Sequence, residues 1–123
     1  MNRFESFQAF YPYYLSEHRN GACRLLHFIG TTGVLGAFVL ALVTGQLALI
    51  LICPVIGYGS AWVGHFIFEK NRPATFQYPL WSLRGDFVMY ADILFGEVPL
   101  FGDLPERFYE GHELSQHRQM TEP

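Results

Sequence analysis

Residues 25–68 read LLHFIGTTGVLGAFVLALVTGQLALILICPVIGYGSAWVGHFIF, and this stretch decides the fold. It consists of two apolar runs, Leu25–Thr44 and Leu47–Phe68, which meet at Gly45 and Gln46. Neither run contains Asp, Glu, Lys or Arg. As a helix, each is long enough to cross a hydrocarbon layer of about 30 Å. The stretch therefore predicts a transmembrane helical hairpin over residues 25–68.

The hairpin would place two histidines at the same depth. His27 lies 18 residues before Gly45, and His65 lies 19 residues after Gln46. In an antiparallel hairpin these separations put the two imidazoles within about 1.5 Å of one another along the axis. Small residues, which let membrane helices approach closely, mark the packed face of each run: Gly30, Gly33, Ala37, Gly57, Ala61 and Gly64. We therefore expect both imidazoles to point between helices, where polar side chains predict a functional site.

The composition agrees with a small membrane protein. Of the 123 residues, 50% are hydrophobic and only 15% are charged, whereas about 25% are charged in ordinary soluble domains. This length predicts one membrane-embedded domain, residues 1–123. The net charge of −3 gives no basic surface for nucleic acid, which is excluded as a partner. Cys23 and Cys53 would lie about 22 Å apart in depth, so we expect two free thiols.

A helix is also predicted before the hairpin. Apolar and aromatic side chains recur with helical spacing through residues 3–18, although Pro12 predicts a break. Its aromatic residues favour a helix at the lipid–water interface, and packing on the bundle is the alternative. The fold class is therefore all-α, a small integral-membrane helical bundle.

Shorter elements are predicted after the hairpin. Residues 69–86 are expected to form a loop, because Pro73 and Pro79 disfavour helix at the residues before them. Residues 87–101 predict a third, shorter helix that is interfacial or re-entrant. Residues 102–123 are polar and predict a loose tail.

The basic residues indicate the orientation in the membrane. All of those outside the tail lie on the side of the open ends of the hairpin, and the Gly45–Gln46 turn has none: Arg3, Arg19, Arg24, Lys70, Arg72 and Arg84. Positive charge is enriched on the cytoplasmic side of membrane proteins, so both termini are predicted to be cytoplasmic.

Four side chains capable of binding a metal gather at the open end of the hairpin. His18 lies just before the first run, at the same end as His27 and His65, and Glu69 follows His65 by one helical turn. Two histidines and a carboxylate with open positions form the non-haem Fe(II) oxygenase arrangement. Three alternatives stay open: hydrogen-bonded packing residues in a non-catalytic scaffold, haem held by His27 and His65 in an electron carrier, and a solvated His18.

Arginines could recognise an acidic ligand. A guanidinium binds a carboxylate through two hydrogen bonds, so Arg72 and Arg84 are candidates for binding a substrate carboxylate. Arg24 is better explained as an anchor at the membrane surface. Asp86 is interpreted as a helix cap, or as an acceptor that orients a ligand histidine.

Several longer motifs resemble a known family. They are YLSEHRN (14–20), RLLHFIGT (24–31), GYGSAWVGHF (57–66), FEKNRPATF (68–76), YP (78–79) and SLRGDF (82–87). These motifs resemble the 2-hydroxy fatty acid dioxygenase family over roughly residues 4–95. The resemblance implies an integral membrane protein that uses Fe(II) and histidine ligands, with His18, His27 and His65 on the histidine positions of the family.

The resemblance also implies the reaction. Members act in the α-oxidation of 2-hydroxy fatty acids, using O2 to cleave the C1–C2 bond and shorten the acid by one carbon. Membrane lipid is then expected as a further partner. Whether the chain forms a homo-oligomer stays an open question at this point. The expected location is the endoplasmic reticulum for a eukaryotic chain, or the inner membrane for a bacterial one.

Overall fold

The computed structural model describes residues 4–109 as an all-helical fold, without a strand in that range. The elements follow in the order α1 (Phe7–Ser16), α2 (Gly21–Thr44), η1 (Leu47–Ile52), α3 (Cys53–Val63), η2 (Gly64–Glu69), η3 (Ala74–Phe76), α4 (Pro79–Leu94) and η4 (Glu106–Phe108). The predicted all-α class is confirmed.

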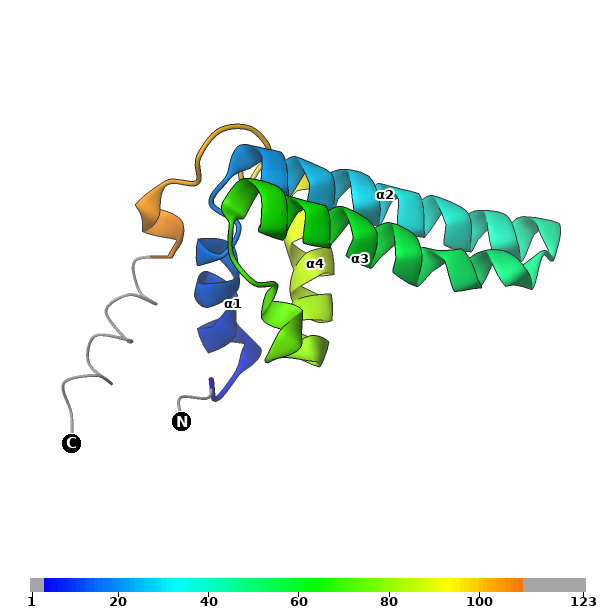
Figure 1. Cartoon of the computed structure of the whole chain (residues 1–123), viewed down its shortest axis with the longest axis horizontal. Helices are drawn as coiled ribbons and strands as arrows, with labels where there is room; N and C mark the ends of the chain where they lie inside the picture. The colour runs from blue at the N-terminus through cyan, green and yellow to red at the C-terminus, as the bar shows by residue number, and fades with distance from the viewer. Residues whose placement is uncertain (1–3, 110–123) are drawn as a thin grey trace.

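The predicted hairpin is present, with slightly longer arms. The first arm is α2, and the second is a continuous helical rod in which η1, α3 and η2 follow one another from Leu47 to Glu69. Gly45 joins the arms in a left-handed conformation (φ 74°), which glycine adopts without strain. The arms lie side by side along their whole length (Figure 1). They touch closely at Gly30, where an added Cβ would lie 2.8 Å from the Cβ of Ser60.

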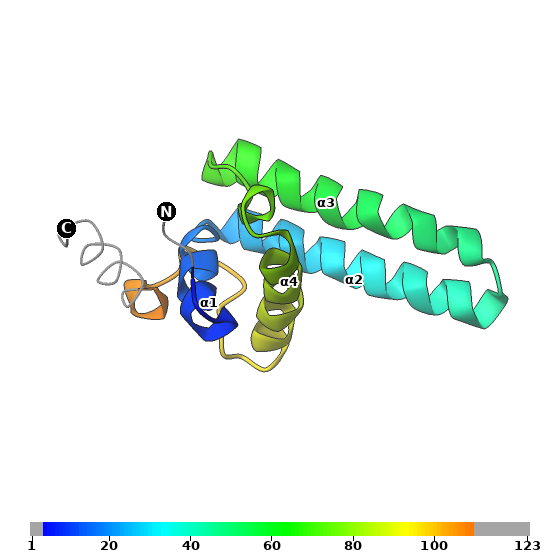
Figure 2. The same ribbon diagram turned by 90° about the horizontal axis from the view of Figure 1, so that it is seen from below.

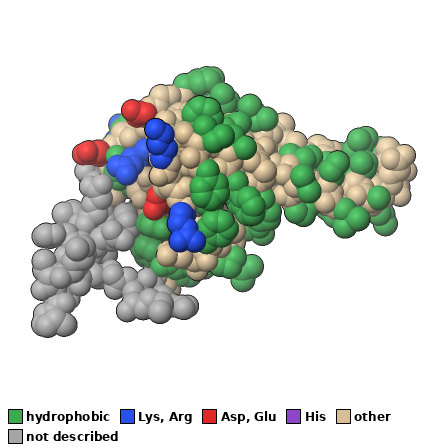
Figure 3. All heavy atoms as spheres, viewed as in Figure 1, with side chains coloured by type: hydrophobic (Ala, Val, Ile, Leu, Met, Phe, Trp, Pro, Cys, Tyr) green, Lys and Arg blue, Asp and Glu red, His purple; other side chains and the backbone are tan. Residues whose placement is uncertain are grey.

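The surface of the hairpin is apolar. Only 17% of the most apolar stretch of α2, and 11% of that in the second arm, is buried within the protein. Val43, Leu51 and Val55 are each more than two-thirds exposed. In Figure 3 the protruding arm shows hydrophobic side chains, while the Lys and Arg side chains on this face lie at the other end. Both helices are long and apolar enough to cross a membrane.

The shorter helices pack across the open end of the hairpin. Figures 1 and 2 show α1 and α4 beside one another and crossing the direction of the hairpin. The core lies between these two helices, η3 and the segment that follows α4: Phe10, Tyr14, Leu15, Ala74, Met89, Val98, Leu104 and Tyr109. Pro12 lies inside α1 without breaking it, contrary to the break that we predicted. This part of the molecule, called the head below (residues 4–20 and 70–109), covers the end of the hairpin where the histidines lie.

Two boundaries in the head differ from the prediction. The third long helix, α4, begins at Pro79 within the predicted loop, eight residues before the predicted start at 87. Proline is well suited to the first turn of a helix, because the N–H that it lacks has no partner there. Leu104 and Tyr109 of the predicted tail are buried in the core, so the tail is not loose as far as residue 109. Residues 110–123 and Arg3 lie outside the described part of the chain.

Arg24 attaches the end of the described chain to the hairpin. Its side chain is fully buried, and it donates hydrogen bonds to the backbone carbonyls of His18, Arg19, Pro99 and Gly102. The membrane-surface role suggested for this arginine does not fit a buried guanidinium that is bonded to four carbonyls. Its role in the structure is to hold the chain before α2 and the chain after α4 together.

Candidate metal centre

Three buried histidines from three different segments meet where the hairpin enters the head. His18 lies in the connection between α1 and α2, His27 in the second turn of α2, and His65 in η2. The Nε2 atom of His18 is 3.1 Å from Nε2 of His27 and 3.0 Å from Nε2 of His65. The structure thus brings together the three histidines that the sequence predicted, which we call the histidine cluster.

Local structure positions the two histidines of the hairpin. Asn20 caps α2 by accepting hydrogen bonds from the N–H groups of Ala22 and Cys23, which fixes where the helix starts. The second arm ends in a π-helical turn at η2, an irregularity that is frequent at functional sites. Lys70 then adopts a left-handed conformation (φ 60°) that reverses the chain and returns Asn71 to His65.

Backbone carbonyls determine which ring nitrogen carries the proton in two of the histidines. Nδ1 of His18 lies 2.6 Å from the carbonyl oxygen of Tyr14, and Nδ1 of His27 lies 2.8 Å from that of Cys23. A carbonyl oxygen only accepts hydrogen bonds, so each Nδ1 must be the donor. In the neutral ring, Nε2 is then left with a free lone pair.

A side-chain amide does the same for the third histidine. Nδ1 of His65 lies 2.8 Å from Oδ1 of Asn71. The amide nitrogen of Asn71 donates to the backbone oxygen of Glu17 and, at 2.6 Å, to its carboxylate, so Oδ1 faces His65 as the acceptor. The Nε2 atom of His65 therefore also presents a lone pair.

Three lone pairs that converge within the cluster repel one another unless a positive charge lies among them. Burial lowers the pKa of His18 well below its usual range, with a further contribution from the neighbouring histidines, so a proton is poorly held there. Neutral imidazoles fixed by a hydrogen bond from the other ring nitrogen are the form that binds metals. Two nitrogens at about 2.1 Å from one ion, at a right angle, would be about 3.0 Å apart.

A void beside the three rings has the size of one ion or water molecule. A void of about 10 Å³ is bounded by the three histidines together with Tyr14, Ala61, Pro73, Ala74, Thr75, Ser82 and Asp86. The hydroxyl oxygen of Ser82 is buried there without a hydrogen-bond partner, a condition that an ion or water in the void would relieve. A porphyrin is far larger than this void, so the donor set fits a single metal ion and not haem.

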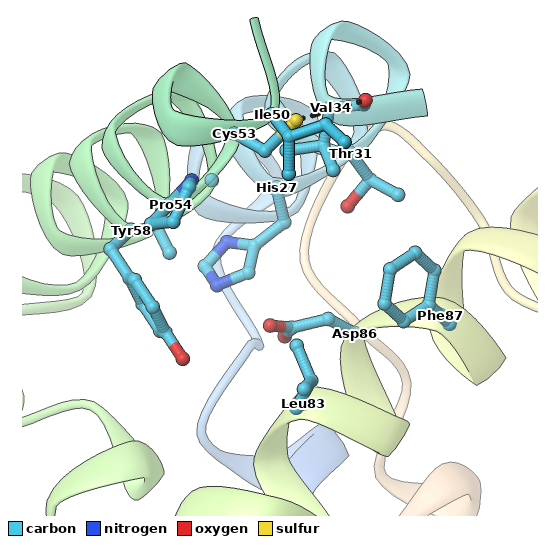
Figure 4. Close-up of a pocket in the computed structure, with 12 residues that line it drawn as sticks. His27, Thr31, Val34, Ile50, Cys53, Pro54, Tyr58, Leu83, Asp86 and Phe87 are labelled. Atoms are coloured by element: carbon cyan, nitrogen blue, oxygen red, sulfur yellow. Dashed lines mark hydrogen bonds between the residues drawn. The ribbon is translucent and has the colours of Figure 1, made fainter. Parts of the chain in front are cut away.

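Tyr14 and Asp86 connect the cluster to α4. The ring of Tyr14 stacks on that of His18 at 4.1 Å between centroids, and its hydroxyl donates to the carboxylate of Asp86. Burial raises the pKa of Asp86 to about 6, which the bond from Tyr14 opposes. Figure 4 shows the Asp86 carboxylate facing the His27 ring across a cavity. Asp86 lies inside α4, so it is not the cap that the sequence suggested.

Three other predicted site residues lie elsewhere. Glu69 accepts a hydrogen bond from the backbone N–H of Asn20 and is not among the ligand atoms of the histidine cluster. The guanidinium of Arg84 lies 4.3 Å from the centre of the Phe7 ring, and that of Arg72 lies 5.6 Å from that of Phe76. Neither arginine lines the void or the cavity beside His27.

The sequence did not predict the contact of Asn71 with His65 or the stacking of Tyr14 on His18. Asn71 is six residues after His65, a separation that an α-helix does not place on one face, and the left-handed turn at Lys70 brings the two together. Tyr14 precedes His18 by four residues, and this helical spacing could have indicated the stacked pair.

Comparison with known proteins identifies the family of the chain. Residues 4–98 match the family described as 2-hydroxy-palmitic acid dioxygenase Mpo1-like. Neither the curated proteins nor the solved structures gave a match. The matched range contains the whole hairpin, the three histidines of the cluster, Asn71 and Asp86. The chain therefore belongs to the Mpo1-like family.

Proposed function

We propose that this chain is a membrane-embedded Fe(II) dioxygenase that cleaves the C1–C2 bond of 2-hydroxy fatty acids. In this reaction the 2-hydroxy acid and O2 give the acid one carbon shorter, CO2 and water. C2 becomes the new carboxyl carbon, and O2 accepts the four electrons that the two carbons lose. The family description supports dioxygenase chemistry on a fatty acid, and the ion and reaction are our inference from the site.

The observation that carries the proposal is the set of three Nε2 lone pairs. Each of the histidines His18, His27 and His65 has its Nδ1 bonded to an oxygen, which leaves the Nε2 atoms for a shared ligand; the ligand atoms of the three residues lie within 4.8 Å of one another, and all three residues line one void. Packing histidines would need no such convergence, because each could satisfy its second nitrogen with a separate partner. Imidazole suits several transition metals, and among them iron supplies the reactivity toward O2 that a dioxygenase needs.

Different residues of the site would bind the metal and contact the substrate. His18, His27 and His65 would hold the iron, which supplies the one-electron chemistry of O2 when bound. Glu69 is engaged by Asn20, so three protein ligands would leave the other coordination positions open. Asp86, which lines a cavity together with His27, would accept the hydrogen of a substrate hydroxyl. The apolar walls of the hairpin would keep water away from the reacting carbons.

A bilayer is the medium that best suits the hairpin. Its two arms expose apolar side chains, while the buried polar groups gather at the head. With the hairpin in the hydrocarbon layer, α1 and α4 would lie along the membrane surface on the side of Arg19, Lys70, Arg72 and Arg84. The positive-inside rule then assigns both termini to the cytoplasm.

The proposal is tested with protein purified in detergent under anaerobic conditions. Fe(II) should bind at one ion per chain without a Soret band, and addition of O2 with 2-hydroxypalmitate should release pentadecanoic acid and CO2. His65→Ala should lose both iron and product, whereas Gln77→Ala, an exposed position outside the void, should keep both. A Soret band would support the haem carrier, and a folded protein that binds no metal would support the scaffold.

A further inference from the structure

A second, larger cavity lies next to the histidine cluster, between the hairpin and α4. Its volume is about 300 Å³, at the lower end of the range for small-molecule sites. The lining residues come from both arms and from α4, and they include His27, Thr31, Val34, Cys53, Tyr58 and Phe87. We call it the hairpin cavity, and Figure 4 shows it with the ring of His27 pointing into it.

The two ends of the hairpin cavity differ in polarity. His27 and Asp86 face one another at the end next to the cluster. At the other end the lining consists of Val34, Ile50 and Cys53. Val34 lies seven residues after His27 on α2, which places the apolar end about 10 Å deeper along the hairpin. A ligand that fits this gradient has a small polar head and a narrow apolar tail.

The outer wall of the cavity is continuous with an apolar surface of α4. Leu80, Leu83, Phe87 and Leu94 follow one face of this helix, and they are 80%, 44%, 41% and 59% exposed. Of these, Leu83 and Phe87 also line the cavity. This face of α4 therefore borders the cavity where the hairpin meets the head, which is the level of lipid headgroups if the hairpin spans the bilayer.

We propose that the hairpin cavity binds the chain of a single-chain acid that arrives sideways from the bilayer, between the hairpin and the apolar face of α4. The polar head lies at His27 and Asp86, and the chain extends toward Val34, Ile50 and Cys53. This assignment rests on the proposed function for the identity of the head, a carboxyl carbon with a neighbouring hydroxyl. It adds the position of the tail, its direction and the route by which it arrives.

The same geometry predicts how the protein selects substrates by the length of their acyl chain. The acyl tail runs from the histidine cluster toward the apolar end of the hairpin cavity. A side chain that projects into this end therefore limits the length of the tail that fits. Val34 stands at that end, where one of its methyl groups lies 3.3 Å from the Cβ that an alanine at Gly57 would carry. A larger side chain at Val34 should therefore exclude long tails and leave room for short ones.

The test compares two valine variants of α2 in metal-free protein held in phosphatidylcholine nanodiscs. Val34→Phe should weaken the binding of 2-hydroxypalmitate at least tenfold and that of 2-hydroxyoctanoate less than threefold. Val39→Phe, at a position that is 56% exposed and outside the cavity lining, should leave both affinities unchanged. Equal affinities of the two variants for 2-hydroxypalmitate would overturn the assignment.

A second measurement does not depend on the folding of a variant. Cys53 lines the hairpin cavity, while Cys23 is fully buried beside Gly64. In the unchanged protein, 2-hydroxypalmitate should slow the alkylation of Cys53 by a membrane-permeant maleimide at least fivefold, as followed by mass spectrometry. An unchanged rate would overturn the assignment. Neither measurement needs iron or turnover, so a failure of the proposed reaction would leave these results intact and would be recognised separately.

Discussion

Replacement of Asn71 by alanine tests whether the histidine cluster is organised by its hydrogen bonds. In the native chain Oδ1 of Asn71 holds the proton of His65 on Nδ1 across 2.8 Å, which leaves Nε2 free for a metal. Without this acceptor, the ring can rotate and can place its proton on Nε2. Loss of such an outer partner typically lowers metal affinity about 10- to 100-fold, or about 1.4–2.8 kcal/mol.

The assay is a competitive titration of Fe(II) or Co(II) against a chelator under anaerobic conditions. Asn20→Ala is the matched control, because Asn20 caps α2 close to the cluster and bonds no histidine. Loss of this cap should cost about 1 kcal/mol of stability and leave the metal affinity within threefold of the native value. Metal binding by Asn71→Ala as tight as in the native protein, or an equal loss of affinity in both variants, would contradict this role of the Asn71 amide.

Substitutions of Arg24 and Gly85 and the protonation of His18 test three other contacts of the head. Arg24→Met should lower the free energy of unfolding, measured with a chemical denaturant, by about 3 kcal/mol or more, because it leaves backbone carbonyls without their donor. A decrease of less than about 1 kcal/mol would contradict the role assigned to this arginine. Gly85→Ala should cost about 1–3 kcal/mol by the same measurement, since its Cβ would lie 2.9 Å from the ring of Tyr14, and an unchanged stability would show that the ring moves freely. Burial lowers the pKa of His18, so its imidazole stays neutral below the usual imidazole pKa of about 6.5. Metal affinity measured against pH should therefore be constant from about pH 8 to about pH 6.5. A loss of affinity centred at about pH 6.5 would contradict this.

The hairpin and two of its histidines were predictable because a straight helix has a fixed rise per residue. Counting residues outward from Gly45 and Gln46 was enough to place His27 and His65 at one depth. The small residues indicated which face of each helix contacts the other arm. His18 was harder to place, since its position depends on the reversal of the chain before α2. Only its proximity to the open end of the hairpin was predictable.

Glu69 shows where helical counting fails. The separation of four residues from His65 predicted one shared face, but the carboxylate of Glu69 accepts a hydrogen bond from the backbone N–H of Asn20, a residue 49 positions earlier in the chain. The buried role of Arg24 was also beyond prediction, because two of the carbonyls that it binds come from residues 99 and 102, which are distant in sequence. Both errors concern contacts between segments, for which local patterns contain no information.

The most direct test of the account is X-ray absorption at the iron edge of protein loaded anaerobically with Fe(II). Three converging Nε2 atoms predict one iron per chain, with the multiple-scattering pattern of three imidazoles and iron–nitrogen distances of about 2.1 Å. His18→Ala, His27→Ala and His65→Ala should each remove one imidazole from the pattern or abolish binding. Iron bound with fewer than three imidazoles in the native protein, or no iron bound at all, would contradict the account.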